Sequence, residues 1–348
     1  MVRTEGEREG RGTVEVETVE PIPHWPGELV DLGGLTVHVR STPEPKTAAP
    51  AETAVFVHGL AGSATNWTDL MGELRDDVRG YALDLPGAGF SPEHPEGDYS
   101  LAAHADAVIA FVEHLGGGPV HLLGNSLGGA VSVRVAATRP DLVRTLTLIS
   151  PAMPDLLPRY GPARVVLSAT PGLGQWALSR LRGLPAERRI RATMAMCFAD
   201  TGRVHPLRLE DAVLEQRRRD ELPWAGPALI YSARALVNEY FRRGEENLWR
   251  LAAQVTAPTL VVHGRHDRLV HPRMAARAGR VFPDVRLVLL HDAGHVAQME
   301  YPSLVALHVR ALLREAATVA TDVPARAPAA RRMPLMPRAL KAHKTAST

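Results

Sequence analysis

The sequence predicts an α/β fold: a mostly parallel, doubly wound sheet with an inserted helical cap. Short apolar runs such as 54–58 alternate with amphipathic segments such as 127–138, as expected when helices cover both faces of a parallel sheet. The alternation stops near Ser150, gives way to a mostly helical pattern, and resumes at 257–264. The 348 residues are 45% hydrophobic and 22% charged, which is typical of a globular chain with a large core.

The expected elements follow one another in order. Residues 35–40 alternate apolar and polar side chains, which indicates a half-buried strand. The continuous apolar run 54–58 indicates a strand buried on both faces. Before the cap we then expect helix 66–74, strand 80–85, helix 99–115, strand 119–124, helix 127–138 and strand 143–150. After the cap we expect strand 257–264, helix 273–281, strand 285–291 and an amphipathic helix 297–316.

This pattern divides the chain into five segments. They are a polar N-terminal extension (1–28), the first part of the core (29–150), the helical cap (151–240), the second part of the core (241–317) and a basic tail (318–348). Within the extension, 13–19 could add an edge strand. The tail is rich in Ala, Pro and Arg, a composition that cannot bury a core, so we expect it to be disordered.

Composition limits the partners. The net charge of +2 combines −3 in residues 1–20 and +5 in 318–348, so the remaining body is neutral. A neutral body argues against a basic nucleic-acid groove. The single cysteine, Cys197, excludes an internal disulfide and a Cys-based zinc cluster. No apolar run approaches the ~20 residues that span a bilayer, and no apolar signal segment follows Met1. We therefore expect a cytoplasmic protein with a small-molecule substrate and no membrane partner; the oligomeric state is not indicated.

The sharpest motif is GNSLG at 124–128, between an apolar strand and a helix. A nucleophilic serine must project from a tight strand-to-helix turn, and small residues on either side leave room for that backbone. The turn also places Ser126 at a helix N-terminus, which favours a developing negative charge. The alternative is a glycine-rich turn with an incidental serine.

A nucleophilic serine needs a base and the base needs an orienting acid. His295 is the best base because it lies in a short loop after a buried strand. Asp267, just beyond the carboxyl end of the preceding strand, is the best acid. Asp292 is its rival, but it precedes His295 by only three residues and could hardly reach the far ring nitrogen.

The order Ser126, Asp267, His295 resembles the α/β-hydrolase fold family. The segment His58–Leu60 is similar to the family's H-G-x motif, and the resemblance implies that the N–H groups of Leu60 and Leu127 form the oxyanion hole. It also implies that His58 braces this loop. By the same resemblance, Asp84 and Ser91 are structural residues of the loop at 84–91, and 151–240 is the cap.

The identity of the nucleophile, Ser126, argues against two classes of enzyme within this family. Epoxide hydrolases and haloalkane dehalogenases of this family carry an aspartate where this chain has Ser126. The segments 124–129 and 294–302 are similar to the meta-cleavage product hydrolases, which split carbon–carbon bonds. The loop at 58–67 and Met299 depart from that pattern, so carboxylesterase chemistry remains open. Metal-free, haloperoxidase-like members share the same three residues and also remain possible.

The substrate-binding residues are less well defined. Asn125, Trp67 and Asn66 are candidates for the pocket lining. Any of five arginines could face a substrate carboxylate: Arg180, Arg182, Arg188, Arg189 and Arg191. The run 217–219 is interpreted as a solvated helix face.

No metal or cofactor is expected. His263, His266, Asp267 and His271 could in principle bind a metal, but the side chains of His263 and His266 need not converge.

The sequence therefore predicts a serine hydrolase that uses Ser126, Asp267 and His295 on an ester or a meta-cleavage-type carbonyl compound. The alternative is a receptor of the same fold, in which hydrolysis is slow and closure of the cap is the signal.

Overall fold

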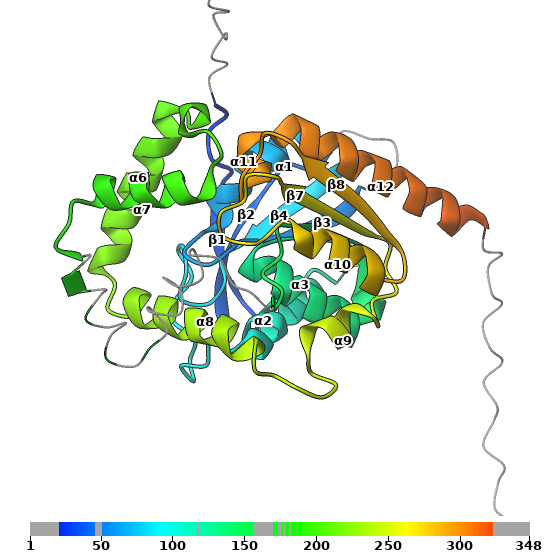
Figure 1. The fold of residues 1–348 in the computed structure, drawn as a ribbon, viewed down its shortest axis with the longest axis horizontal. Helices are drawn as coiled ribbons and strands as arrows, with labels where there is room; N and C mark the ends of the chain where they lie inside the picture. Colours follow the sequence, from blue (N-terminus) through cyan, green and yellow to red (C-terminus); the bar gives the residue numbers. More distant parts are fainter. Residues whose placement is uncertain are drawn as a thin grey trace, which may run out of the picture.

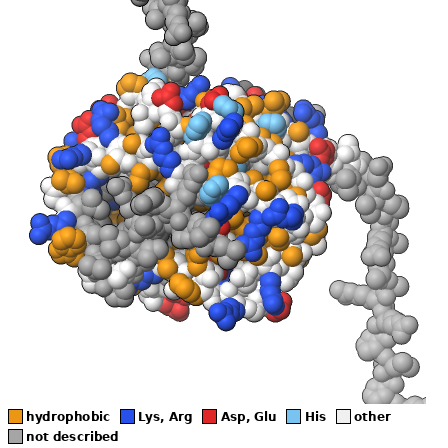
Figure 2. Space-filling model, viewed as in Figure 1, with side chains coloured by type: hydrophobic (Ala, Val, Ile, Leu, Met, Phe, Trp, Pro, Cys, Tyr) orange, Lys and Arg blue, Asp and Glu red, His pale blue; other side chains and the backbone are white. Residues whose placement is uncertain are grey.

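The computed structural model describes residues 21–45, 51–116, 118–155, 170, 172, 176, 179–180 and 182–322. The proposed edge strand at 13–19 and the tail beyond residue 322 lie outside the described residues. Among the described helices, none has the length and apolar character that crossing a bilayer requires. On the face shown in Figure 2, the Lys and Arg side chains are dispersed among acidic and apolar ones.

The core of the fold is one eight-stranded sheet with the order β1-β2-β4-β3-β5-β6-β7-β8. All neighbours are parallel except β2, which is antiparallel to β1 and β4. This confirms the predicted mostly parallel sheet. The strands are β1 (Gly27–Asp31), β2 (Thr36–Ser41), β3 (Glu52–Val57), β4 (Val78–Leu83), β5 (Val120–Asn125), β6 (Val143–Ile149), β7 (Thr259–Gly264) and β8 (Val285–Leu290).

Helices cover both faces of this sheet (Figure 1). Alternate residues of β3 point to opposite sides, so Val55 and Val57 belong to one apolar cluster and Ala54 and Phe56 to the other. The first cluster is closed by α2 (Leu101–His114), α3 (Leu127–Thr138), α9 (Leu248–Ala252) and α10 (Arg273–Val281). The second is closed by α1 (Thr68–Leu74), α11 (Ala297–Glu300) and α12 (Pro302–Asp322). Burial of each large side chain stabilises the fold by about 1.5–3 kcal/mol.

Between β6 and β7 the chain leaves the sheet and forms the helices α6 (Ala186–Cys197), α7 (Pro206–Glu221) and α8 (Ala225–Glu239). They lie to one side of the sheet, on the left in Figure 1. Among the residues that the structure describes, the buried members of their own apolar cluster are Ala186, Ile190 and Val213. These helices therefore depend on contacts with the core for much of their stability.

Several elements differ from those expected. The strand β1 and the short helix α9 were not predicted; β1 is mostly exposed and is held by a hairpin to β2, with Gly33 and Gly34 at positive φ. The final helix divides at Tyr301, because Pro302 has no N–H to donate and instead begins α12. Short 3-10 turns cover Ala64–Trp67, Pro140–Leu142 and Thr201–Arg203.

Candidate active site

Ser126 occupies a strained turn between β5 and α3. Its φ of 53° and ψ of −115° lie in a region that residues with a side chain rarely adopt, at a cost of about 1–3 kcal/mol. The backbone is fixed by hydrogen bonds from Ser126 N to Ile149 O (3.1 Å) and from Ala152 N to Ser126 O (2.9 Å). The serine side chain is thus held out of the helix and toward the cavity that it lines.

The glycines of the motif are required by space. A Cβ on Gly124 would lie 2.4 Å from the carbonyl oxygen of Gly128, and a Cβ on Gly128 would lie 2.1 Å from that of Val57. Both distances are far below van der Waals contact. Any larger residue at either position would push α3 away from the sheet and with it the turn that carries Ser126.

His295 and Asp267 meet after β8 and β7. His295 Nδ1 lies 2.9 Å from Asp267 Oδ2, and both side chains are almost completely buried. Asp267 Oδ1 accepts the N–H groups of Leu269 (2.8 Å) and Val270 (2.9 Å). With Nδ1 donating to the carboxylate, Nε2 of the neutral ring is left as a proton acceptor.

Burial alone would raise the pKa of Asp267, but the charges and hydrogen bonds of His295 and His263 outweigh it and hold that pKa below its ordinary value. His263 Nε2 lies 3.4 Å from the same Oδ2. The carboxylate is therefore ionised at neutral pH and can stabilise a positive charge on the imidazole. The rival acid, Asp292, is exposed and pairs with His291 at 2.7 Å.

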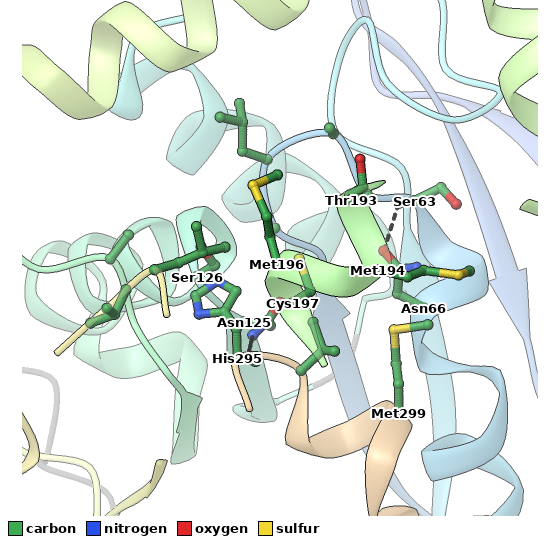
Figure 3. Close-up of a pocket in the computed structure, with 18 of the residues that line it drawn as sticks. Ser63, Asn66, Asn125, Ser126, Thr193, Met194, Met196, Cys197, His295 and Met299 are labelled. Carbon is green, nitrogen blue, oxygen red and sulfur yellow. Dashed lines mark hydrogen bonds between the residues drawn. The ribbon is translucent and has the colours of Figure 1, made fainter. Parts of the chain in front are cut away.

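The loop of His295 is tied to the rest of the site by its backbone. Its N–H donates to Cys197 O of the cap (2.7 Å), and its carbonyl accepts Asn125 Nδ2 (3.1 Å). Asn125 Nδ2 also donates to Ile149 O (3.0 Å). Asn125 lines the cavity as expected, but both of its amide hydrogens hold protein carbonyls, so it positions His295 (Figure 3).

The loop after β3 approaches Ser126 closely. A Cβ on Gly59 would lie 3.1 Å from the Cβ of Ser126, so only glycine leaves this gap unstrained. His58 Nδ1 contacts Gly59 O at 2.8 Å, and its Nε2 accepts Leu85 N–H at 3.0 Å. Burial lowers the pKa of His58. A neutral His58 thus braces the loop, as the resemblance implied.

The two expected oxyanion donors come from separate segments. Leu60 lines the cavity directly after Gly59, and Leu127 follows Ser126 as the first residue of α3. The first N–H groups of a helix have no partner within that helix. The Leu127 amide is therefore suited to donate to an acceptor beside Ser126.

Trp67 was expected to line the pocket, but it lies outside the cavity lining. Its side chain is fully buried in the second apolar cluster, with its ring centre 5.4 Å from that of Phe56. It closes the 3-10 turn Ala64–Trp67 and packs onto the sheet, outside the cavity lining. Asn66 does line the cavity, and its Oδ1 accepts Ser63 N–H at 3.0 Å.

Ser126 and His295 line one cavity of about 530 Å³, between the sheet edge and the cap. This size lies within the ~300–1,000 Å³ range of small-molecule sites. The five arginines offered as carboxylate ligands are absent from the described part of its lining. Arg189 pairs with Asp220 and Arg191 with Glu187.

Sequence reasoning missed the contribution of α7. Arg219 lines the cavity and donates to Ala61 O at 2.9 Å, and Arg218 donates to Gly89 O. The run 217–219 is therefore partly a core contact and not simply a solvated face. Arg208, Asp211 and Glu215 are spaced by three and four residues along this helix, and this spacing of charged residues could have indicated that one face of α7 lines the cavity.

Of the metal candidates, His263 and Asp267 belong to the buried network at His295. His266, His291 and Asp292 bring their ligand atoms within 4.8 Å of one another, but all three are exposed and outside the cavity lining. The donor atoms of His263 and Asp267 are thus engaged in the contacts that hold the His295 ring.

The sequence model of the alpha/beta hydrolase fold matches residues 54–302. The chain belongs to this family, which confirms the predicted fold and, at the level of the family, the predicted hydrolase.

Three particular proteins are similar to it. Over 273 residues the chain is 33% identical to the dihydrolipoyllysine-residue acetyltransferase component of the acetoin cleaving system of Cupriavidus necator, a match that covers 78% of this chain and 65% of that protein. The chain thus spans just under two thirds of this relative's length. It is 27% identical over 289 residues to 2-(acetamidomethylene)succinate hydrolase of Mesorhizobium japonicum, covering 81% of this chain and 92% of that one. The solved meta-cleavage product hydrolase from Pseudomonas fluorescens shares the fold, with a TM-score of 0.64, 19% identity and coverage of 84% and 98%.

Proposed function

We propose that the protein is a serine hydrolase in which Ser126 attacks the carbonyl carbon of a small ester. His295 is the general base and Asp267 its orienting acid. The observation that carries the proposal is the 2.9 Å contact between His295 Nδ1 and the buried Asp267 carboxylate. The strained backbone of Ser126, beside the same cavity, supports it further.

In the first half-reaction, His295 Nε2 takes the proton of Ser126 Oγ as that oxygen bonds to the carbonyl carbon. The carbonyl oxygen becomes an oxyanion and accepts the N–H groups of Leu60 and Leu127, each worth about 3–4 kcal/mol of barrier. When the tetrahedral species collapses, the imidazolium gives its proton to the departing alcohol. Asp267 remains ionised throughout and stabilises the imidazolium.

In the second half-reaction, His295 removes a proton from water, which attacks the acyl group on Ser126. Collapse of that tetrahedral species releases the acid and returns the proton to Ser126 Oγ. Residues of the cap helices α6 and α7 line the same cavity and limit the access of solvent to it.

Carbon–carbon cleavage is a second candidate, favoured by the similarity of 124–129 and 294–302 to the meta-cleavage product hydrolases. The same three residues would act after the dienol substrate becomes a ketone. The two reactions differ in the leaving group, which is an alcohol for the ester and a carbanion equivalent for the dienoate.

The test compares wild type with Ser126→Ala on p-nitrophenyl esters of increasing chain length and on a ring-cleavage dienoate. We expect the variant to lose at least about 10⁴-fold in kcat. Ser303→Ala, on the exposed start of α12, is the matched control and should turn over normally. Preference for the dienoate would assign carbon–carbon cleavage. A burst followed by near-silence would favour the receptor, and normal turnover by Ser126→Ala would contradict the proposal.

A further inference from the structure

The cavity beside Ser126 has an apolar side built largely from methionine. Met194 and Met196 of α6 and Met299 of α11 line it (Figure 3), together with Met153 from the segment after β6. Methionine is flexible and polarisable, so it adapts to apolar groups of different shape. Ile190, Leu236 and Phe241 add further apolar side chains to the lining.

The two arginines of the described lining are already occupied. Arg208 contacts Asp69 Oδ1 at 2.6 Å and Ile22 O at 2.7 Å. Arg219 donates to Ala61 O at 2.9 Å and lies 3.8 Å from Glu215. An incoming carboxylate would have to displace one of these partners to gain a cation.

The carboxylates of the lining outnumber these arginines. Asp155, Asp211 and Glu215 face the cavity against Arg208 and Arg219, among the residues that the structure describes. Asp155 is held from behind by Arg273 through contacts of 2.8 and 2.7 Å, whereas Asp211 lies 3.7 Å from Arg208. Each described arginine beside the cavity thus already has a carboxylate partner, and an anion that enters gains no uncompensated positive charge from these side chains.

His24, which also lines the cavity, adds no positive charge to it at neutral pH. Burial and the neighbouring Arg208 lower the pKa of His24, which favours its neutral form. His271 Nδ1 accepts the N–H of Arg273 at 3.1 Å. His295 is the base of the reaction in the proposal above.

We propose that the site selects uncharged substrates with an apolar acyl group and discriminates against esters that carry a second carboxylate. This inference rests on the proposed function of Ser126. It gives the chain a substrate class unlike the succinate derivative in the name of its Mesorhizobium relative.

The experiment compares p-nitrophenyl hexanoate with the mono-p-nitrophenyl ester of adipic acid, which has the same chain length and a terminal carboxylate. We expect kcat/KM for the neutral ester to be at least about 100-fold higher, since a desolvated carboxylate without a free cation is strongly disfavoured. Equal rates, or preference for the adipate ester, would overturn the substrate class while Ser126-dependent turnover upheld the function. Absence of turnover with both esters would overturn both.

A pair of variants tests the electrostatic cause. Glu215→Gln and, independently, Asp211→Asn remove a negative charge from the lining and should shift the ratio of the two kcat/KM values about tenfold toward the adipate ester. Glu187→Gln, an exposed partner of Arg191 outside the lining, should leave the ratio as in wild type. A ratio that neither lining variant changes would overturn the assignment of selectivity to these carboxylates.

Discussion

The core and the cap face the same cavity but hold their side chains in different ways. On the core side, Asp267 accepts two backbone N–H groups and contacts the imidazoles of His295 and His263, and all three of these side chains are buried. On the cap side, α7 reaches the core through the long, partly exposed side chains of Arg208 and Arg219. Buried, backbone-anchored groups tolerate little displacement, whereas a long guanidinium side chain has five N–H donors and can keep a partner through small shifts. We infer that the core determines the chemistry and that the cap adjusts which substrate reaches it.

The largest effect should come from the core. Asp267→Asn replaces an acceptor of three hydrogen bonds by an amide, which would favour the wrong tautomer of His295. We expect kcat for an ester to fall about 10⁴-fold, measured under saturating substrate with folding checked by circular dichroism. Asp292→Asn, at the exposed acid three residues before His295, should retain wild-type kcat; an equal loss in both variants would refute the assignment.

The next effect concerns Glu300, which connects the core to the cap. Glu300 accepts Gly294 N–H (2.7 Å) in the His295 loop and Ala199 N–H (2.8 Å) from the cap. Glu300→Gln leaves one of these buried donors without an acceptor, at about 1–3 kcal/mol. We expect kcat to fall about 10–100-fold with KM nearly unchanged. A change in KM alone would mean that Glu300 supports only the cap.

A smaller effect should appear in the pH dependence of stability. His104 Nε2 lies 3.0 Å from Ser232 Oγ, which joins α2 to α8, and burial lowers the pKa of His104 to about 3. The unfolded chain takes up a proton at this residue below about pH 6.5 while the folded protein does not. The contribution of neutral, buried His104 to the free energy of unfolding is thus complete above pH 6.5 and is lost progressively as the pH falls toward 3.

The slope from this one residue is about 1.4 kcal/mol per pH unit. Urea denaturation between pH 7 and 4 should show this slope in wild type and a shallower one in His104→Gln. An identical pH dependence in the two proteins would show that His104 is accessible to protons in the folded state.

The smallest effect is expected in the cap itself. Arg219→Gln removes the contact to Ala61 O, next to the Leu60 amide, without touching the catalytic groups. We expect kcat/KM to fall by no more than about fivefold, mainly through KM. Arg191→Gln, on the exposed side of α6, should behave as wild type. A several-hundredfold loss of kcat/KM in Arg219→Gln would show that this cap contact matters for the reaction as much as the core residues do.

Local chemistry explains what could be predicted from the sequence. The mostly parallel sheet follows from apolar runs separated by segments of helical periodicity. The turn at Ser126 follows from its flanking glycines, because close backbone contacts leave no room there for a side chain. His295 and Asp267 were found because each follows a strand, and parallel strands end at one edge of a sheet. These signals lie within a few residues of the feature that they predict.

The remaining features depend on distant contacts. Whether Trp67 faces the cavity or the core depends on Phe56 and on the direction of a 3-10 turn. The placement of Arg219 depends on Ala61, 158 positions earlier in the chain. The residues of strand β1 are mostly exposed, and they form a strand because their backbone pairs with β2. None of these partners can be identified from a residue's own neighbourhood in the sequence.

In the proposed mechanism Ser126 carries the covalent acyl group. Reaction with a fluorophosphonate, followed by peptide mapping with mass spectrometry, examines this step. We expect a single adduct on the peptide that contains Ser126, with loss of ester turnover in proportion to labelling and no adduct in Ser126→Ala. Full loss of turnover with the adduct on another residue, or rapid turnover while Ser126 is fully labelled, would contradict it.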